Sequence, residues 1–278
     1  VYKRQAGRMI PKDFITEWRD RAPWVLDRQV EQDLVISRAL VELFSRTPIA
    51  DALAFRGGTA LYKLHITPAA RYSEDIDLVQ TSPGGIGDVL DAIHDALDPW
   101  LGKPKWKQTE GRVTLNYRFE SEDVPPVGLK LKVEINSREH FTAYGLKQHR
   151  FEVSSRWFTG TANLLTYDLD ELLGTKLRAL YQRKKGRDLF DLGLALQQSD
   201  VSPERIVEVF AKYMEADRAK VTRAMVEQNL AAKKKDPIVT ADMTPLLAHG
   251  QAWDFDDAFE RVWTELVGRL SGDPWKGG

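Results

Sequence analysis

The chain has 278 residues, of which 42% are apolar and 29% charged, and its formal net charge is −1. This composition indicates a globular protein of one large or two ordinary domains, and the near-zero charge excludes a basic field over the whole surface that would attract nucleic acid. Without cysteine, disulfides and thiolate metal sites are excluded, and no apolar run approaches the ~20 residues needed to cross a bilayer. Residues 1–9 are polar and basic and lack the apolar core of a signal peptide, so we expect a cytoplasmic protein. Since the chain opens on Val1, we also expect its natural start to be missing or altered.

The first half of the chain is predicted to mix helices with strands. A short capped helix is expected within residues 10–24, and apolar residues then recur at helical spacing from about Leu26 to Phe44. Paired glycines at 57–58 interrupt the pattern, and a helix restarts over Thr59–Leu64. Further along, the pattern predicts a strand at 76–79, a helix over 86–97, and strands at 113–119 and 129–136.

From Asp168 onward the pattern is almost entirely helical. Helices are predicted over 169–183, 187–198, 203–216 and 255–270, with a polar, proline-containing connection over 233–245. We therefore expect an α/β (α+β) protein with a mixed sheet and flanking helices over residues 1–160. A helical C-terminal domain is expected over residues 161–278.

The paired glycines and a following acidic pair carry the strongest chemical signal. Gly57-Gly58-Thr59 opens a helix, and a helix N-terminus offers backbone N–H groups to a phosphate. Asp75 and Asp77 lie two apart on a predicted strand, so their side chains share one side and present four oxygens to a hard cation such as Mg²⁺. Acidic residues on an exposed strand edge would explain the pair alone, but together with the glycines it favours metal-dependent chemistry on a nucleoside triphosphate.

Glu134 is the candidate third carboxylate. It lies on the polar side of a predicted strand with Lys130, Lys132 and Asn136. An ordinary solvated face accounts for this pattern almost as well. In the functional interpretation Glu134 acts as base on an attacking hydroxyl or as ligand of a second metal ion.

The helical half adds a lysine and an arginine–aspartate cluster. Lys176 precedes Arg187 and Asp188, which begin a new helix, and Asp191 follows one turn later on the same side. Surface ion pairs of little energetic value would explain these charges. They are also the groups that a triphosphate and its developing charge require. Lys63, in the helix after the paired glycines, is a further candidate for nucleotide binding.

These motifs, in this order, resemble the AbiEii/AbiGii toxin family of the DNA polymerase β nucleotidyltransferase superfamily, to which the MenT toxins of mycobacteria are related. The resemblance rests on Gly57-Gly58-Thr59, on Ser73-Glu74-Asp75-Ile76-Asp77-Leu78, on the strand around Glu134, and on Lys176 with Arg187-Asp188-Leu189-Phe190-Asp191, over roughly residues 30–200. The last block is the most specific part of it.

The resemblance implies a toxin of a type IV toxin–antitoxin, or abortive infection, system. Its partner would be a cognate antitoxin, often a winged-helix regulator, and its reaction the transfer of a nucleotide to the 3′ end of tRNA. By this resemblance Asp75 and Asp77 hold Mg²⁺ or Mn²⁺, Gly58 and Thr59 contact the triphosphate, and Lys176 binds its phosphates. Asp191 is a fourth essential residue, and the helical domain completes the active site.

Two alternatives remain open from the residues. The acceptor could be a small hydroxyl compound such as an aminoglycoside, or the chain could bind a nucleotide or partner without turnover. The run Lys233-Lys234-Lys235 is expected to be a solvated loop, and the five histidines show no metal-ligand spacing.

Overall fold

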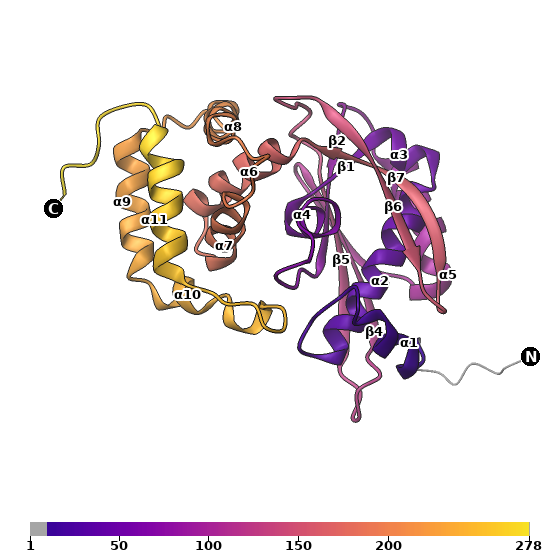
Figure 1. Cartoon of the computed structure of the whole chain (residues 1–278). Coiled ribbons are helices and arrows are strands. Elements are labelled where there is room, and N and C mark those ends of the chain that lie inside the picture. Colours follow the sequence, from indigo (N-terminus) through magenta and orange to yellow (C-terminus); the bar gives the residue numbers. More distant parts are fainter. Residues whose placement is uncertain (1–9, 278) are drawn as a thin grey trace, which may run out of the picture. The chain divides into compact units, whose positions relative to one another are not determined.

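The computed structural model describes residues 10–277, which divide into two compact units (Figure 1). The N-terminal unit comprises the chain up to Phe141 together with Leu146–Tyr167. The C-terminal unit comprises Asp168 onward together with the short segment Thr142–Gly145. The segment 1–9, whose polar character argues against a signal peptide, lies outside the described residues.

The N-terminal unit, as far as it is described, is built on a seven-stranded mixed sheet with the order β3-β4-β5-β2-β1-β7-β6. Two pairings are parallel, β2 with β5 and β1 with β7, and the other pairings are antiparallel. The strands are β1 (Leu53–Arg56), β2 (Asp75–Gln80), β3 (Lys105–Thr109), β4 (Arg112–Glu120), β5 (Gly128–Asn136), β6 (Leu146–Ser154) and β7 (Thr159–Tyr167).

One face of this sheet is apolar and buried. Burial alternates along β2, β4 and β5, so that Ile76, Leu115 and Val133 are fully buried while their neighbours in sequence are partly exposed. Helices α2 and α5 pack against each other and against these strands. The helices of this unit are α1 (Lys12–Trp18), α2 (Asp27–Phe44), α3 (Thr47–Ala52), α4 (Gly57–Leu64) and α5 (Gly87–Leu101). Because side chains alternate across a strand, covering one face leaves the other for polar residues.

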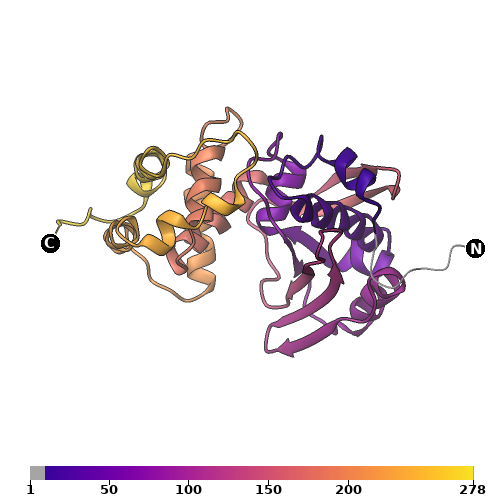
Figure 2. The ribbon, with the colours of Figure 1, turned by 90° about the horizontal axis from the view of Figure 1, so that it is seen from below.

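The C-terminal unit is helical (Figure 2). Helix α6 packs on α7 and α8, and α7 also packs on α11. The elements are α6 (Leu169–Gln182), α7 (Gly186–Ala195), α8 (Pro203–Ala216), α9 (Arg223–Lys234), α10 (Pro237–Ala241), the 3₁₀ turn η1 (Thr244–Leu246), α11 (Phe255–Glu265) and η2 (Val267–Arg269).

A buried carboxylate ties the segment 142–145 into the helical unit. Glu171, in the first turn of α6, is fully buried and accepts hydrogen bonds from the Thr142 hydroxyl, from the Ala143 and Tyr144 N–H groups, and from the Tyr213 hydroxyl, at 2.7–3.0 Å. A buried charge needs such partners, because burying an unpaired charge destabilises the folded protein by on the order of several kcal/mol. This carboxylate explains why four residues between β5 and β6 belong to the C-terminal unit.

The structure confirms the expected fold class, a mixed sheet with flanking helices followed by a helical half. The units divide at Tyr167/Asp168 and not near residue 160, because β7 continues through Tyr167 and pairs with both β1 and β6. The connection expected over 233–245 is wrong in part, since α10 forms within it and Lys233 is a buried residue in the last turn of helix α9.

Lys233 is therefore not part of a solvated loop. Its ammonium donates to the carbonyl oxygens of Leu180 and Tyr181 at the end of α6, the latter at 2.7 Å. Helix C-termini carry unpaired carbonyls and a partial negative charge, which a lysine satisfies. Burial lowers the pKa of Lys233 to about 8.

Candidate active site

The acidic residues lie together on the polar face of the sheet. Asp75 and Asp77 are on β2, and the parallel pairing with β5 sets Asp75 beside Lys132 and Asp77 beside Glu134. Paired residues in neighbouring strands point to the same face, so three carboxylates and one lysine share it. The sequence predicted the two aspartates as neighbours, and the sheet register adds Glu134.

Lys132 carries the positive charge of this group. Its ammonium lies 2.9 Å from Asp75 Oδ2 and 3.6 Å from Glu134 Oε2, and Arg112 Nε lies 3.5 Å from Glu134 Oε1. Burial alone would lower the pKa of Lys132, but the hydrogen bond to Asp75 and the nearby carboxylates outweigh it and raise the pKa. Lys132 thus stabilises Asp75 directly.

Asp77 is in a different electrostatic environment. Its pKa is raised, first because burial removes water from the carboxylate and then because Asp75 repels its charge, while Lys132 and Arg56 oppose the shift. An anion held under such conditions gains stability from any added positive charge. Positive charge from a bound cation would therefore stabilise the Asp77 carboxylate.

The paired glycines bring the start of helix α4 against Asp77. Gly57 has φ +84, in the left-handed region that favours glycine, and a Cβ added there would lie 2.3 Å from Asp77 Oδ2. At Gly58 an added Cβ would lie 2.6 Å from the Arg71 guanidinium. Gly57 is thus required both for the backbone turn and for close approach to the carboxylate.

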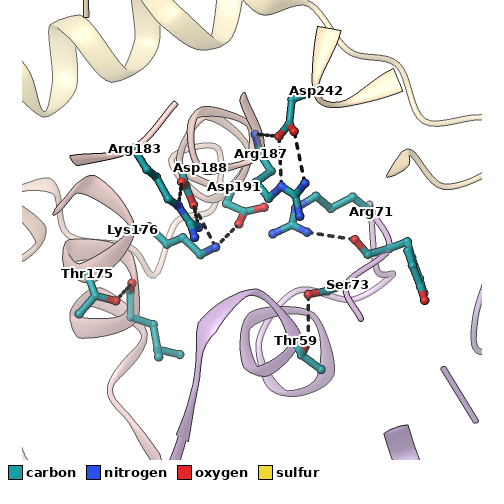
Figure 3. Close-up of polar contacts among 12 residues, drawn as sticks. Thr59, Arg71, Ser73, Thr175, Lys176, Arg183, Arg187, Asp188, Asp191 and Asp242 are labelled. Carbon is teal, nitrogen blue, oxygen red and sulfur yellow. Dashed lines mark hydrogen bonds and ion pairs between the residues drawn. The ribbon is translucent and has the colours of Figure 1, made fainter. Parts of the chain in front are cut away.

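Thr59 fixes α4 to the beginning of β2 (Figure 3). Its hydroxyl donates to the carbonyl oxygen of Asp75 at 2.5 Å and lies 2.9 Å from the Ser73 hydroxyl. With the Thr59 proton on a carbonyl acceptor, the Ser73 hydroxyl donates to Thr59. The buried Thr59 therefore orients the strand that carries the acidic pair, and contact with a triphosphate stays a prediction.

Lys63 lies one turn further along α4 and lines a cavity of about 400 Å³ in the N-terminal unit. Its ammonium bonds to Asp33 Oδ1 at 2.6 Å and to the Ser37 hydroxyl at 3.0 Å. Asp33 also accepts hydrogen bonds from the indoles of Trp18 and Trp24. These contacts give Lys63 a structural partner, and its role in nucleotide binding stays a prediction.

The predicted residues of the helical unit form a second cluster (Figure 3). Lys176 on α6 lies 3.3 Å from Asp188 Oδ1 and 2.8 Å from Asp191 Oδ2 on α7, and all three side chains are buried. Arg183 forms a two-point contact with Asp188 at 2.7 and 2.8 Å. These are not the exposed surface pairs that the charges alone would suggest, because both aspartates have no solvent exposure.

Arg187 points to a different partner within that unit. It binds Asp242 through both a side-chain fork and its backbone N–H, at 3.1–3.2 Å. Burial by itself would raise the pKa of Asp242, but the hydrogen bonds from Arg187 outweigh it and lower the pKa. Arg187 thus joins the start of α7 to the residue after α10.

The family model for the nucleotidyltransferase AbiEii toxin of type IV toxin–antitoxin systems matches residues 38–261. The chain belongs to this AbiEii family. The match spans both units and includes each of the predicted site residues.

Solved structures show the same fold. MenT4, a nucleotidyltransferase toxin of Mycobacterium tuberculosis H37Rv, is similar with a TM-score of 0.66 and 17% identity, over 94% of this chain and 91% of that one. JHP933 of Helicobacter pylori is similar with a TM-score of 0.50 and 16% identity, over 86% of this chain and 90% of that one. A comparison with curated proteins gave no match.

The AbiEii membership establishes a nucleotidyltransferase toxin that acts on a nucleotide and has an antitoxin partner. It also confirms the family to which the sequence motifs pointed. Along residues 10–277 we find no helix with the length and apolar character that crossing a bilayer requires.

Several residues of the candidate site are not predicted by the sequence motifs. The sequence pattern places Lys132 only on the polar face of a strand, although its position two before Glu134 puts it on the same side as that carboxylate. Arg56, whose partner is Glu139, precedes the paired glycines and opposes the raised pKa of Asp77. Ser73 belongs to the block that carries the resemblance, but its contact with Thr59 depends on a loop of residues 65–74 that no periodic pattern predicts.

Proposed function

We propose that this AbiEii-family protein is a metal-dependent NTP:RNA nucleotidyltransferase whose acceptor is the 3′ end of tRNA. The observation that carries the proposal is the face on which Asp75 and Asp77 lie beside Glu134, with the N-terminus of α4 against Asp77. Carboxylates for a cation and helix N–H groups for a phosphate are the two requirements for binding a nucleoside triphosphate with its metal.

The residues present fit a divalent cation at Asp75 and Asp77. The fit rests on the raised pKa of Asp77 and on the space beside its carboxylate that a Cβ at Gly57 would fill. Among residues 10–277, no group of three or more His, Cys, Asp or Glu side chains is arranged as a ligand set. We therefore assign Mg²⁺, or Mn²⁺, to the two aspartates alone. When bound, the ion would supply positive charge to the phosphates of the nucleotide.

The chemistry of the chain's own groups follows from their positions. The acceptor hydroxyl forms a bond to the α-phosphorus, the bond between the α- and β-phosphates breaks, and pyrophosphate leaves. Glu134 takes the proton of the hydroxyl, which its place beside Asp77 supports. The start of α4 holds the phosphates through backbone N–H groups, which the absence of side chains at Gly57 and Gly58 leaves accessible to close approach.

The helical unit provides the remaining elements of the proposal. Lys176 and Asp191, held together as a buried pair, are expected to be essential for activity, with Lys176 acting on the phosphates. The cognate antitoxin is expected to be a winged-helix regulator that neutralises the toxin.

A transfer assay tests this function. Purified protein, Mg²⁺, each labelled NTP in turn and total bacterial tRNA are combined, with Asp77→Ala as the inactive variant. Asp51→Asn serves as the matched control, because Asp51 is an exposed aspartate of α3 in the same unit. Label on tRNA with the native and control proteins, and none with Asp77→Ala, is the expected result. Pyrophosphate release upon addition of small hydroxyl compounds, with no label on RNA, would instead assign a small acceptor, and NTP-dependent thermal stabilisation without any release would assign a binding protein.

A further inference from the structure

The face that carries the acidic residues continues across two more strands of the N-terminal unit. Strand β4 pairs with β5 so that Thr114 lies beside Glu134 and Asn116 beside Lys132. Strand β3 pairs with β4 so that Lys107 lies beside Thr114 and Lys105 beside Asn116. Two parallel rows therefore cross the sheet: Asp77, Glu134, Thr114, Lys107, and Asp75, Lys132, Asn116, Lys105.

The part of this face away from the aspartates is basic. Arg112, Arg118 and Lys130 lie on it as well, since Arg112 contacts Glu134 and Arg118 pairs with Lys130 in register. The basic face, as we define it, consists of five exposed cations: Lys105, Lys107, Arg112, Arg118 and Lys130. Its carboxylate neighbours are Glu120 at the end of β4 and Glu110 in the β3–β4 turn, and Glu110 is paired with Arg138 at 2.7 Å.

These cations are available for a ligand. Within residues 10–277, Lys105, Lys107, Arg118 and Lys130 make no ion pair, and Arg112 is 60% exposed with only a 3.5 Å contact to Glu134. The chain as a whole has a net charge of −1, so five cations on one face are a local concentration and not a general property of the surface. Such a concentration is the electrostatic footprint expected of a nucleic-acid contact.

Protection of a sheet edge does not explain the whole pattern. Lysines on edge strands prevent pairing with other chains, and β3 is an edge strand. However, Arg112 lies on the interior strand β4 at a position that pairs with Thr109 of β3 on one side and with Asn136 of β5 on the other. Arg118 and Lys130 pair with each other beyond the paired parts of β3 and β2. The cations also share the face of the acidic residues, whereas Trp106, registered beside buried Leu115, takes the other face of β3.

We infer that the basic face binds the phosphate backbone of the acceptor RNA and leads its end to Asp75 and Asp77. Three strand spacings of ~4.8 Å separate β3 from β2, so the face extends ~14 Å from the acidic pair. RNA phosphates along that length meet exposed cations, and the reacting end meets the carboxylates. This inference rests on the proposed function for its choice of RNA, and it names the surface that the acceptor occupies.

The test compares two variants of equal charge change. The first is Lys105→Gln with Lys107→Gln and Arg118→Gln. The second, the control, is Lys12→Gln with Arg46→Gln and Arg150→Gln, which are exposed residues of the same unit outside the basic face. Binding of fluorescently labelled total tRNA is measured by anisotropy over a salt series, and transfer to tRNA and NTP-dependent thermal stabilisation are measured beside it.

The expected result is specific to RNA. Each phosphate contact contributes ~0.7–0.9 to the slope of log affinity against log salt, so three lost contacts reduce the slope by about 2–3 and the affinity at about 0.1 M salt by about 10- to 100-fold. The control variant and NTP-dependent stabilisation should not change. Equal tRNA binding by native and first-variant proteins would overturn the inference while leaving transfer, and so the proposed function, intact. Polyglutamate is used as a second probe in the same anisotropy measurement. If the first variant loses polyglutamate binding and keeps tRNA binding, the basic face binds an acidic protein partner and not RNA. Absence of transfer by the native protein would reject the proposed function on its own.

Discussion

Neutralising each of the two aspartates of β2 should change the stability of the protein by different amounts. Asp75 is paired with Lys132 at 2.9 Å, whereas Asp77 has a raised pKa because of burial and the charge of Asp75. Residues two apart on a strand are separated by ~6.6 Å, at which two like charges repel by ~2.5 kcal/mol at an effective dielectric constant of ~20. Lys132 offsets part of this repulsion. We expect Asp77→Asn to raise the free energy of unfolding by about 1–2 kcal/mol, in the range by which functional residues commonly reduce stability.

Asp75→Asn is the matched control. It removes the same repulsion but also leaves Lys132 without its hydrogen-bonded carboxylate, so we expect no gain in stability. Both variants should lose transfer activity by at least ~100-fold, because each removes a charge that acts on the reacting phosphates. Urea unfolding in the presence of EDTA, with transfer assayed separately, measures both quantities. Destabilisation by Asp77→Asn, or equal stabilisation by the two variants, would refute the electrostatic argument.

Three further predictions follow from the described contacts. Burial raises the pKa of Glu31 from 4.5 to about 7, so the folded state holds this proton to higher pH and loses roughly 3 kcal/mol of stability between these values; Glu31→Gln should abolish that loss in urea melts at several pH values, and an unchanged pH profile would contradict it. Gly57→Ala should destabilise by about 2 kcal/mol or more and abolish activity, since φ is positive and the Cβ meets a carboxylate, while Gly58→Ala meets the buried Arg71 guanidinium without the cost of a positive φ and should destabilise less; equal thermal shifts for the two would contradict this. Lys176→Met leaves two buried aspartates without their lysine and should lower the free energy of unfolding, measured by chemical denaturation, by about 3–5 kcal/mol. A variant as stable as the native protein would show that these side chains do not form a charged cluster.

The sequence by itself determined the local chemistry. Spacing of two on a strand suffices to place Asp75 and Asp77 together, and the structure shows both on the polar face of β2. The paired glycines mark the start of a helix, which the structure shows as α4 with a positive φ at Gly57. Asp188, expected near the start of a helix, lies in the first turn of α7, where the helix dipole favours an acid. Helix α8 likewise begins and ends where periodicity predicted, at Pro203 and Ala216.

The tertiary structure alone decided which distant residues meet. The pairing of β2 with β5 sets Glu134 beside Asp77 and Lys132 beside Asp75. No local sequence pattern encodes the register of two strands that lie more than fifty residues apart along the chain. Lys233, in a run that resembles a solvated loop, is buried because α9 brings it to the end of α6. The same strand register aligns Lys105 and Lys107 with the acidic pair, so the basic face exists only once the sheet has formed. Sequence spacing fixes neighbours within one element, whereas contacts between elements depend on packing that the whole chain determines.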